Sequence, residues 1–88
     1  MKIANMIGHS GNAVKNQFIV ELDNGDRYFQ SYQSVIVKIS SNGVVFLDST
    51  YWDYSVTTGK YRNLFLGESK DETKRKIDSG EYKLVNLN

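Results

Sequence analysis

Residues 18–30 read FIVELDNGDRYFQ, and this stretch decides the fold class of the chain. Every second residue from Phe18 to Leu22 is apolar, so these side chains share one face of an extended strand. The pair Asn24-Gly25 follows, and both residue types accept the positive φ angle that a tight hairpin turn requires. Residues 27–30 are therefore predicted to return antiparallel to the first strand.

A second hairpin is predicted directly after the first. Residues 34–40 read SVIVKIS and are rich in the β-branched side chains that favour strands. The pair Asn42-Gly43 supplies another hairpin turn, after which the apolar residues 44–47 can pair with the preceding strand. Together the two hairpins predict a meander of four antiparallel strands.

A polar stretch and a short helix are predicted after the fourth strand. Residues 49–55 carry three aromatic rings among polar side chains, which indicates a packed loop. Thr57 or Thr58 can cap the helix that follows, because a threonine hydroxyl accepts from a free backbone N–H of the first turn. Gly67 is placed to end the helix.

A second short helix is predicted from Ser69 to about Ser79. Ser69 and Glu72 have the spacing of a capping box, in which each side chain bonds the backbone N–H of the other residue. Ile77 is the only apolar residue of this segment, so an exposed helix stabilised by its own charges is expected. Two acid-first i,i+4 pairs support it: Asp71–Arg75 and Glu72–Lys76.

The resulting prediction is one α+β domain over residues 1–88. It contains an antiparallel β-meander of four to five strands, with the two short helices inserted before a C-terminal strand in residues 81–87. Residues 1–16 are expected to form a loosely ordered lead-in segment. The last strand could close the sheet or pair with a second chain, which makes a homodimer conceivable.

Composition excludes several classes of protein. The chain has no cysteine, so neither disulfides nor a thiolate metal site can stabilise it. Its formal net charge is +1, which creates no global attraction to nucleic acid or to an anionic membrane. No apolar run approaches the ~20 residues that span a bilayer, and no signal peptide is visible, so a cytoplasmic location and no membrane partner are expected.

The motifs of catalysis and metal binding are weak. His9 is the only histidine, and a serine beside it in sequence seldom points toward it as a nucleophile. The acidic turn 23–26 lacks the other ligands of a calcium loop, and the glycines of 8–12 lack the lysine of a phosphate loop. An enzyme would require His9, Asp48 and Asp53 to meet in one cleft. We therefore predict no enzyme, no metal and no cofactor.

Aromatic and basic residues in the middle of the chain are the strongest functional signal. Such rings can form the core of a small domain, serve as hot spots for a protein partner, or stack with nucleic-acid bases beside cations. The candidate binding residues are Tyr51, Trp52, Tyr54, Lys60, Tyr61 and Arg62.

Several stretches of the chain also resemble a family. They read YFQSYQS at 28–34, YWDYS at 51–55, TT at 57–58, KYRN at 60–63 and FLGE at 65–68. From about residue 11 to residue 87 the chain resembles small uncharacterised proteins encoded by bacteriophages and related mobile elements. The resemblance implies a bacterial host cytoplasm and no known activity, so it assigns no catalytic residue.

The function expected from these observations is a non-enzymatic binding module whose partner is a host or phage protein. The alternative is weak binding of single-stranded nucleic acid by the same surface, through aromatic stacking and the nearby lysines and arginines.

Overall fold

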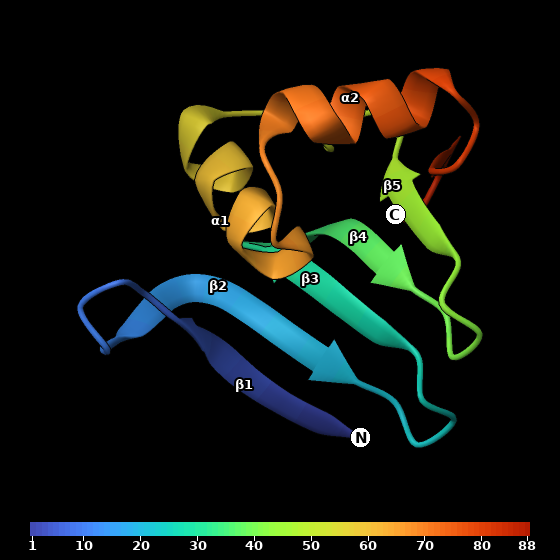
Figure 1. The fold of residues 1–88 in the computed structure, drawn as a ribbon. Helices are drawn as coiled ribbons and strands as arrows, with labels where there is room; N and C mark the ends of the chain where they lie inside the picture. The colour runs from blue at the N-terminus through green and yellow to red at the C-terminus, as the bar shows by residue number, and fades with distance from the viewer.

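In the computed structural model, which describes residues 1–88, the two predicted hairpins form the middle of a six-stranded sheet (Figure 1). The hairpin strands are β2 (Ala13–Glu21), β3 (Arg27–Ser31), β4 (Ser34–Ile39) and β5 (Val45–Asp48), all paired antiparallel. Gly25 and Gly43 have φ angles of 95° and 88°, the left-handed conformation that the two turns require. Both Asn-Gly hairpins are therefore confirmed.

The sheet is larger than predicted and is mixed. β1 (Lys2–Ile7) pairs antiparallel with β2, and β6 (Lys83–Val85) pairs parallel with β5. The prediction of four to five purely antiparallel strands was therefore wrong. The last strand is parallel because the chain crosses back through two helices between β5 and β6, instead of turning through a hairpin.

The segment 1–16, expected as a loose lead-in, contains β1 and the beginning of β2. The side chains of β1 do not show the alternation of buried and exposed residues that is typical of a strand, because five of its six residues are exposed and only Met6 is buried. β1 is held by backbone pairing along β2, from Lys2 opposite Glu21 to Ile7 opposite Ala13.

Both helices lie on the same side of the sheet. The first, α1 (Val56–Leu66), begins at Ser55 instead of the predicted threonines, because the Ser55 hydroxyl accepts from the backbone N–H of Thr58. It ends at Gly67, whose φ is 69°, as predicted. The second, α2 (Lys70–Asp78), has the predicted capping box between Ser69 and Glu72.

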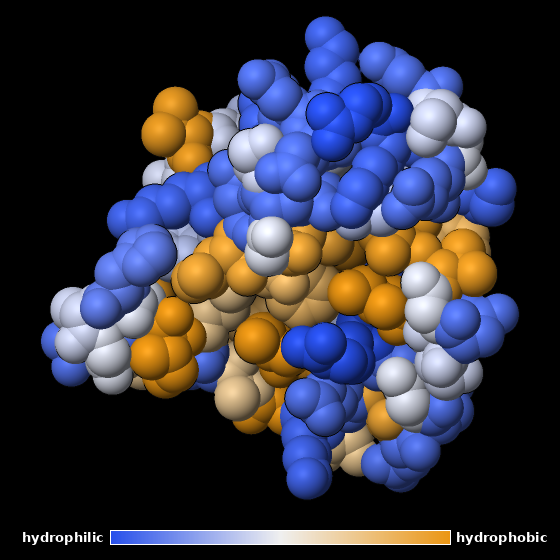
Figure 2. Space-filling view, in the orientation of Figure 1, coloured by the Kyte–Doolittle hydropathy of each residue, from blue (hydrophilic) through white to orange (hydrophobic).

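The charges of α2 pair differently from the prediction. Lys76 does not bond Glu72, since its ammonium lies 2.9 Å from the carboxylate of Glu68, in the loop before the helix. Thr73 and Ile77 face inward, and the remaining residues leave α2 hydrophilic on its outer side. Figure 2 shows this hydrophilic surface over α2 at the top of the view, above a hydrophobic band over α1 and the middle of the sheet.

The core lies between the sheet and the helices. Its buried apolar residues come from strands β1, β3, β4 and β5 and from the segment before β6: Met6, Phe29, Ile36, Val37, Leu47 and Tyr82. Phe65 of α1 stacks on Phe29 with ring centroids 5.8 Å apart. Neither helix has the length and the run of apolar residues that crossing a lipid bilayer requires.

Candidate functional site

Three tyrosines from two separate parts of the chain line one small pocket beside the beginning of α1. Tyr32 comes from the turn between β3 and β4, and Tyr51 and Tyr54 come from the loop before α1. The pocket has a volume of about 170 Å³, enough for one side chain. We call it the tyrosine pocket; its lining is Ser31, Tyr32, Ser34, Ile36, Tyr51, Tyr54, Ser55 and Thr58.

Two of the three tyrosines are exposed. Tyr54 has 69% of its surface exposed and Tyr32 has 58%, although both are large and partly apolar. Tyr51 is half-buried against the core, and its ring meets that of Tyr54 edge to face with centroids 5.3 Å apart. Tyr51 therefore anchors Tyr54 at the mouth of the pocket.

Tyr32 is held in a strained backbone conformation. Its φ angle is 55°, in the left-handed region that costs a residue with a Cβ about 1–2 kcal/mol. The conformation is fixed by a hydrogen bond from its N–H to the carbonyl of Asn16, at 2.7 Å, and by one from Gln30 to its own carbonyl, at 2.8 Å. The two-residue turn between β3 and β4 requires this positive φ angle, which glycine or asparagine usually provides, so a tyrosine is an unusual residue at this position.

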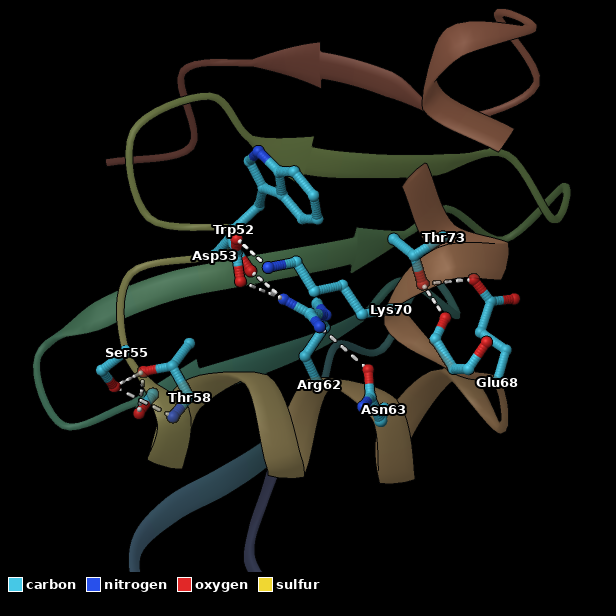
Figure 3. Close-up of polar contacts among 11 residues, drawn as sticks. Trp52, Asp53, Ser55, Thr58, Arg62, Asn63, Glu68, Lys70 and Thr73 are labelled. Atoms are coloured by element: carbon cyan, nitrogen blue, oxygen red, sulfur yellow. Dashed lines mark hydrogen bonds and ion pairs between the residues drawn. The ribbon is translucent and has the colours of Figure 1, made fainter. Parts of the chain in front are cut away.

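Hydroxyl groups form the inner wall of the tyrosine pocket. The buried hydroxyls of Ser31 and Thr58 lie 3.3 Å apart and share a hydrogen bond. The Ser55 hydroxyl donates to that of Thr58 at 3.1 Å while it accepts from the Thr58 N–H. Figure 3 shows Ser55 and Thr58 in this arrangement at the beginning of α1. The pocket thus offers polar contacts inside and aromatic contacts at its mouth.

A wider basic cleft lies on the other side of Ser55. It has a volume of about 590 Å³, and its charged lining is Asp53, Lys60, Arg62 and Lys70. Three cations and one carboxylate leave the cleft with a surplus of two positive charges. Lys60 is the cation free of hydrogen bonds and ion pairs, with its ammonium 5.4 Å from the ring of Tyr61.

Arg62 is a buried connector and not a surface contact. Only 1% of it is exposed. Its guanidinium donates to the carbonyl of Trp52 at 2.7 Å and to the side chain of Asn63 at 2.9 Å, and it lies 5.2 Å from the centre of the Trp52 ring. Figure 3 shows Arg62 reaching from α1 toward Trp52 and Asp53. The arginine therefore holds the aromatic loop against the helix.

Asp53 joins both helices to the loop. Its carboxylate lies 2.8 Å from the ammonium of Lys70, at the beginning of α2, and 3.4 Å from the guanidinium of Arg62. The hydrogen bond from Lys70 lowers the pKa of Asp53 below its ordinary value, and Arg62 lowers it further against the opposing effect of burial. Asp53 is therefore ionised at neutral pH, and its two carboxylate oxygens are already paired with Arg62 and Lys70.

The six candidate residues have different places in this structure. Tyr51 and Tyr54 line the tyrosine pocket, and Lys60 and Arg62 line the basic cleft. Trp52 and Tyr61 are half-buried and pack against the core. The candidate binding residues did not include Tyr32, which lies between the two predicted hairpins, or Lys70, which lies at the beginning of the second predicted helix.

Two other carboxylates, Asp48 and Glu68, are buried and stabilise the fold. Burial raises the pKa of Asp48, but hydrogen bonds from the backbone of Leu87, Tyr51 and Thr50 bring it below its ordinary value. Glu68 behaves similarly, because it accepts from Thr73, Lys76 and Tyr82. Each carboxylate ties a chain end or a helix to the sheet, with no free cleft in front of it.

The groups proposed for an enzyme do not interact. His9 lies in the turn between β1 and β2, and no hydrogen bond or ion pair joins it to Asp48 or Asp53. No group of three or more histidine or acidic side chains is arranged to hold a metal ion.

Comparison with known proteins identifies the family of the chain. A family model matches residues 1–81, from β1 to the residue before Tyr82. The chain belongs to the family of unknown function DUF8033. The match includes every residue of the tyrosine pocket and the basic cleft, so both lie inside the DUF8033 region. No curated protein and no solved structure matches the chain.

Proposed function

We propose that this DUF8033 domain is a non-enzymatic binding module of bacteriophage or mobile-element origin that holds a protein partner at the tyrosine pocket. The observation that carries the proposal is that two exposed tyrosines, Tyr32 and Tyr54, line the same pocket, with Tyr32 at a positive φ angle. A tyrosine ring contributes most to the stability of a fold when it is buried, and these two rings are mostly exposed. Tyrosine is enriched among the residues that dominate protein interfaces.

The pocket and the cleft suggest what the partner presents. A volume of about 170 Å³ accommodates one side chain, and the hydroxyls of Ser31, Ser55 and Thr58 favour one with a polar group at its end. The adjacent cleft has a surplus of positive charge, with Lys60 available at its rim. The partner surface is therefore proposed to insert one polar side chain with an acidic residue beside it.

The test begins with capture from a bacterial lysate by the immobilised domain, followed by purification of the captured protein and calorimetric titration. Tyr54→Ala is the main variant, because a side chain that is 69% exposed can be removed without disturbing the core. We expect its dissociation constant to rise at least tenfold, which is a loss of at least about 1.4 kcal/mol of binding free energy. Binding should also weaken as salt is raised.

Tyr32→Gly separates binding from folding. Glycine adopts the left-handed conformation without a Cβ clash, so the variant should unfold at the same temperature as the natural chain or at a higher one. It should nevertheless bind the partner at least tenfold more weakly.

Leu84→Ala is the matched control, since Leu84 is exposed on β6, away from the pocket, and its removal should leave the affinity unchanged. A partner that binds all of these variants equally well would refute the proposal.

A further inference from the structure

The sheet face opposite the helices carries a row of residues that crosses all six strands. Cross-strand pairs link Ile3 to Val20, Val20 to Tyr28, Tyr28 to Lys38, Lys38 to Phe46 and Phe46 to Lys83. Directly paired residues point to the same face of a sheet. We call this set the open row: Ile3, Val20, Tyr28, Lys38, Phe46 and Lys83.

Alternation along the strands places the open row away from the core. Phe29, Val37 and Leu47 each follow or precede a row residue, and all three are fully buried on the helix side. Neighbours in a strand point to opposite faces. None of the row residues belongs to the core or packs against it, and both helices lie on the other side of the sheet (Figures 1 and 3).

The centre of the open row alternates aromatic rings with a cation. The ammonium of Lys38 lies 5.8 Å from the ring centre of Tyr28 and 5.6 Å from that of Phe46. The two rings stand two strands apart, which is about 10 Å between their backbones. Lys38 therefore stands between two part-exposed rings, in reach of both.

The open row and the carboxylate of Asp26 beside it have a net charge of +1. The row contains Lys38 and Lys83 and no acidic residue. The carboxylate of Asp26 forms an ion pair with the Lys38 ammonium at 3.8 Å and also accepts from the backbone N–H of Ser41, so Lys83 is the cation of the row that has no ion-pair partner. Rings that stack with bases, separated by a cation that meets the phosphate, are the elements by which proteins hold single-stranded nucleic acid.

We propose that the open row is a second binding surface, and that its ligand is single-stranded nucleic acid. Bases stack on Tyr28 and Phe46, while Lys38 and Lys83 contact the phosphates on either side of Phe46. This surface is separate from the tyrosine pocket, since the two lie on opposite faces of the sheet. Failure of either proposal leaves the other standing.

The test is the fluorescence anisotropy of labelled dT15 and rU15 oligonucleotides titrated with the whole chain. Two phosphate contacts predict an affinity that falls about sevenfold between 50 and 200 mM salt. Tyr28→Leu and Phe46→Leu keep an apolar side chain but lose the flat ring, and each should weaken binding about tenfold. Lys38→Gln should weaken binding and reduce the salt dependence, and it keeps the test valid if a ring variant fails to fold.

Lys74→Gln is the matched control, because Lys74 is an exposed lysine of α2 and its replacement should change neither the affinity nor its salt dependence. Trp52, the single tryptophan, packs against the core on the helix side of the sheet, away from the open row. Its fluorescence should therefore stay almost constant as oligonucleotide is added.

Three results would overturn the proposal. The first is no binding of either oligonucleotide at 50 mM salt. The second is binding that Lys60→Gln weakens and Lys38→Gln does not, with strong quenching of Trp52, which would move the nucleic acid to the basic cleft. The third is a chain that light scattering shows to be a dimer, with Phe46→Leu restoring the monomer, which would make the row an interface between two copies.

Discussion

Gln17 is a buried residue whose side-chain amide makes no hydrogen bond within the protein. It lies on β2 opposite Ser31, with 1% of it exposed, and neither atom of its amide has a hydrogen-bond partner in the protein. A buried amide without partners costs about 1–3 kcal/mol by mutational measurements. Gln17→Met keeps the length and flexibility of the side chain and removes that cost.

We expect Gln17→Met to increase the free energy of unfolding by about 1 kcal/mol. Urea denaturation followed by circular dichroism would measure the change. Gln33→Met is the control, because Gln33 is exposed in the neighbouring turn and its replacement should stay within about 0.5 kcal/mol of zero. A loss of stability at position 17 would mean that the amide has a partner, such as a buried water.

At the scale of elements, Arg62 connects α1 to the loop that carries the aromatic residues. Its guanidinium satisfies a carbonyl, a carboxylate and an amide at once, and its stem fills space beside the Trp52 ring. We expect Arg62→Ala to reduce the free energy of unfolding by about 3 kcal/mol, since it leaves a cavity and a buried carbonyl without a donor. Thermal unfolding followed by Trp52 fluorescence would measure the loss.

Arg62→Lys tests the geometry behind that loss. An ammonium cannot reach the same three acceptors as a planar guanidinium, so this variant should still lose about 2 kcal/mol. Arg75→Ala is the matched control on the exposed side of α2, with an expected change of no more than about 0.5 kcal/mol. If Arg62→Lys were as stable as the natural chain, a positive charge alone would suffice at this position.

The whole molecule should lose stability at high pH through the cluster that joins α2 to the segment before β6. Burial and the hydrogen bond to Glu68 raise the pKa of Tyr82 from 10.0 to about 12, and the hydrogen bond to Glu68 raises that of Lys76 from 10.5 to about 12. Both values are higher in the folded chain than in the unfolded chain. The stability that these groups contribute is therefore complete below pH 10 and is lost between about pH 10 and 12.

Urea denaturation at pH 8, 10 and 11.5 would measure this loss, and Tyr82→Phe provides the comparison. Phenylalanine has no hydroxyl to ionise, so the variant should begin less stable at pH 8 and fall less steeply as the pH rises. Tyr61→Phe removes a hydroxyl outside this cluster and is the control variant. Equal slopes for the natural chain and Tyr82→Phe would contradict the role of the cluster.

Local signals in the sequence located most of the secondary structure. Asn24-Gly25 and Asn42-Gly43 specify their turns because few residue types tolerate positive φ angles, and Ser69 and Glu72 specify a helix start because their side chains bond the adjacent backbone. β1 escaped prediction because an exposed edge strand is held by backbone bonds, which leave little trace in side-chain pattern. The parallel direction of β6 depends on the path of the whole crossover.

Local sequence was enough to predict the two Asn-Gly hairpins, the end of α1, the extent of α2 and the concentration of aromatic and basic residues between positions 51 and 62, since each depends on neighbours within a few residues. Which of those aromatic and basic residues are exposed depends on the tertiary structure. It buried Arg62, packed Trp52 against the core, brought Tyr32 beside Tyr54 and aligned Tyr28, Lys38 and Phe46 across three strands. These contacts and alignments join residues that are far apart in the chain. They are therefore set by packing and by strand register, which short stretches of sequence do not specify.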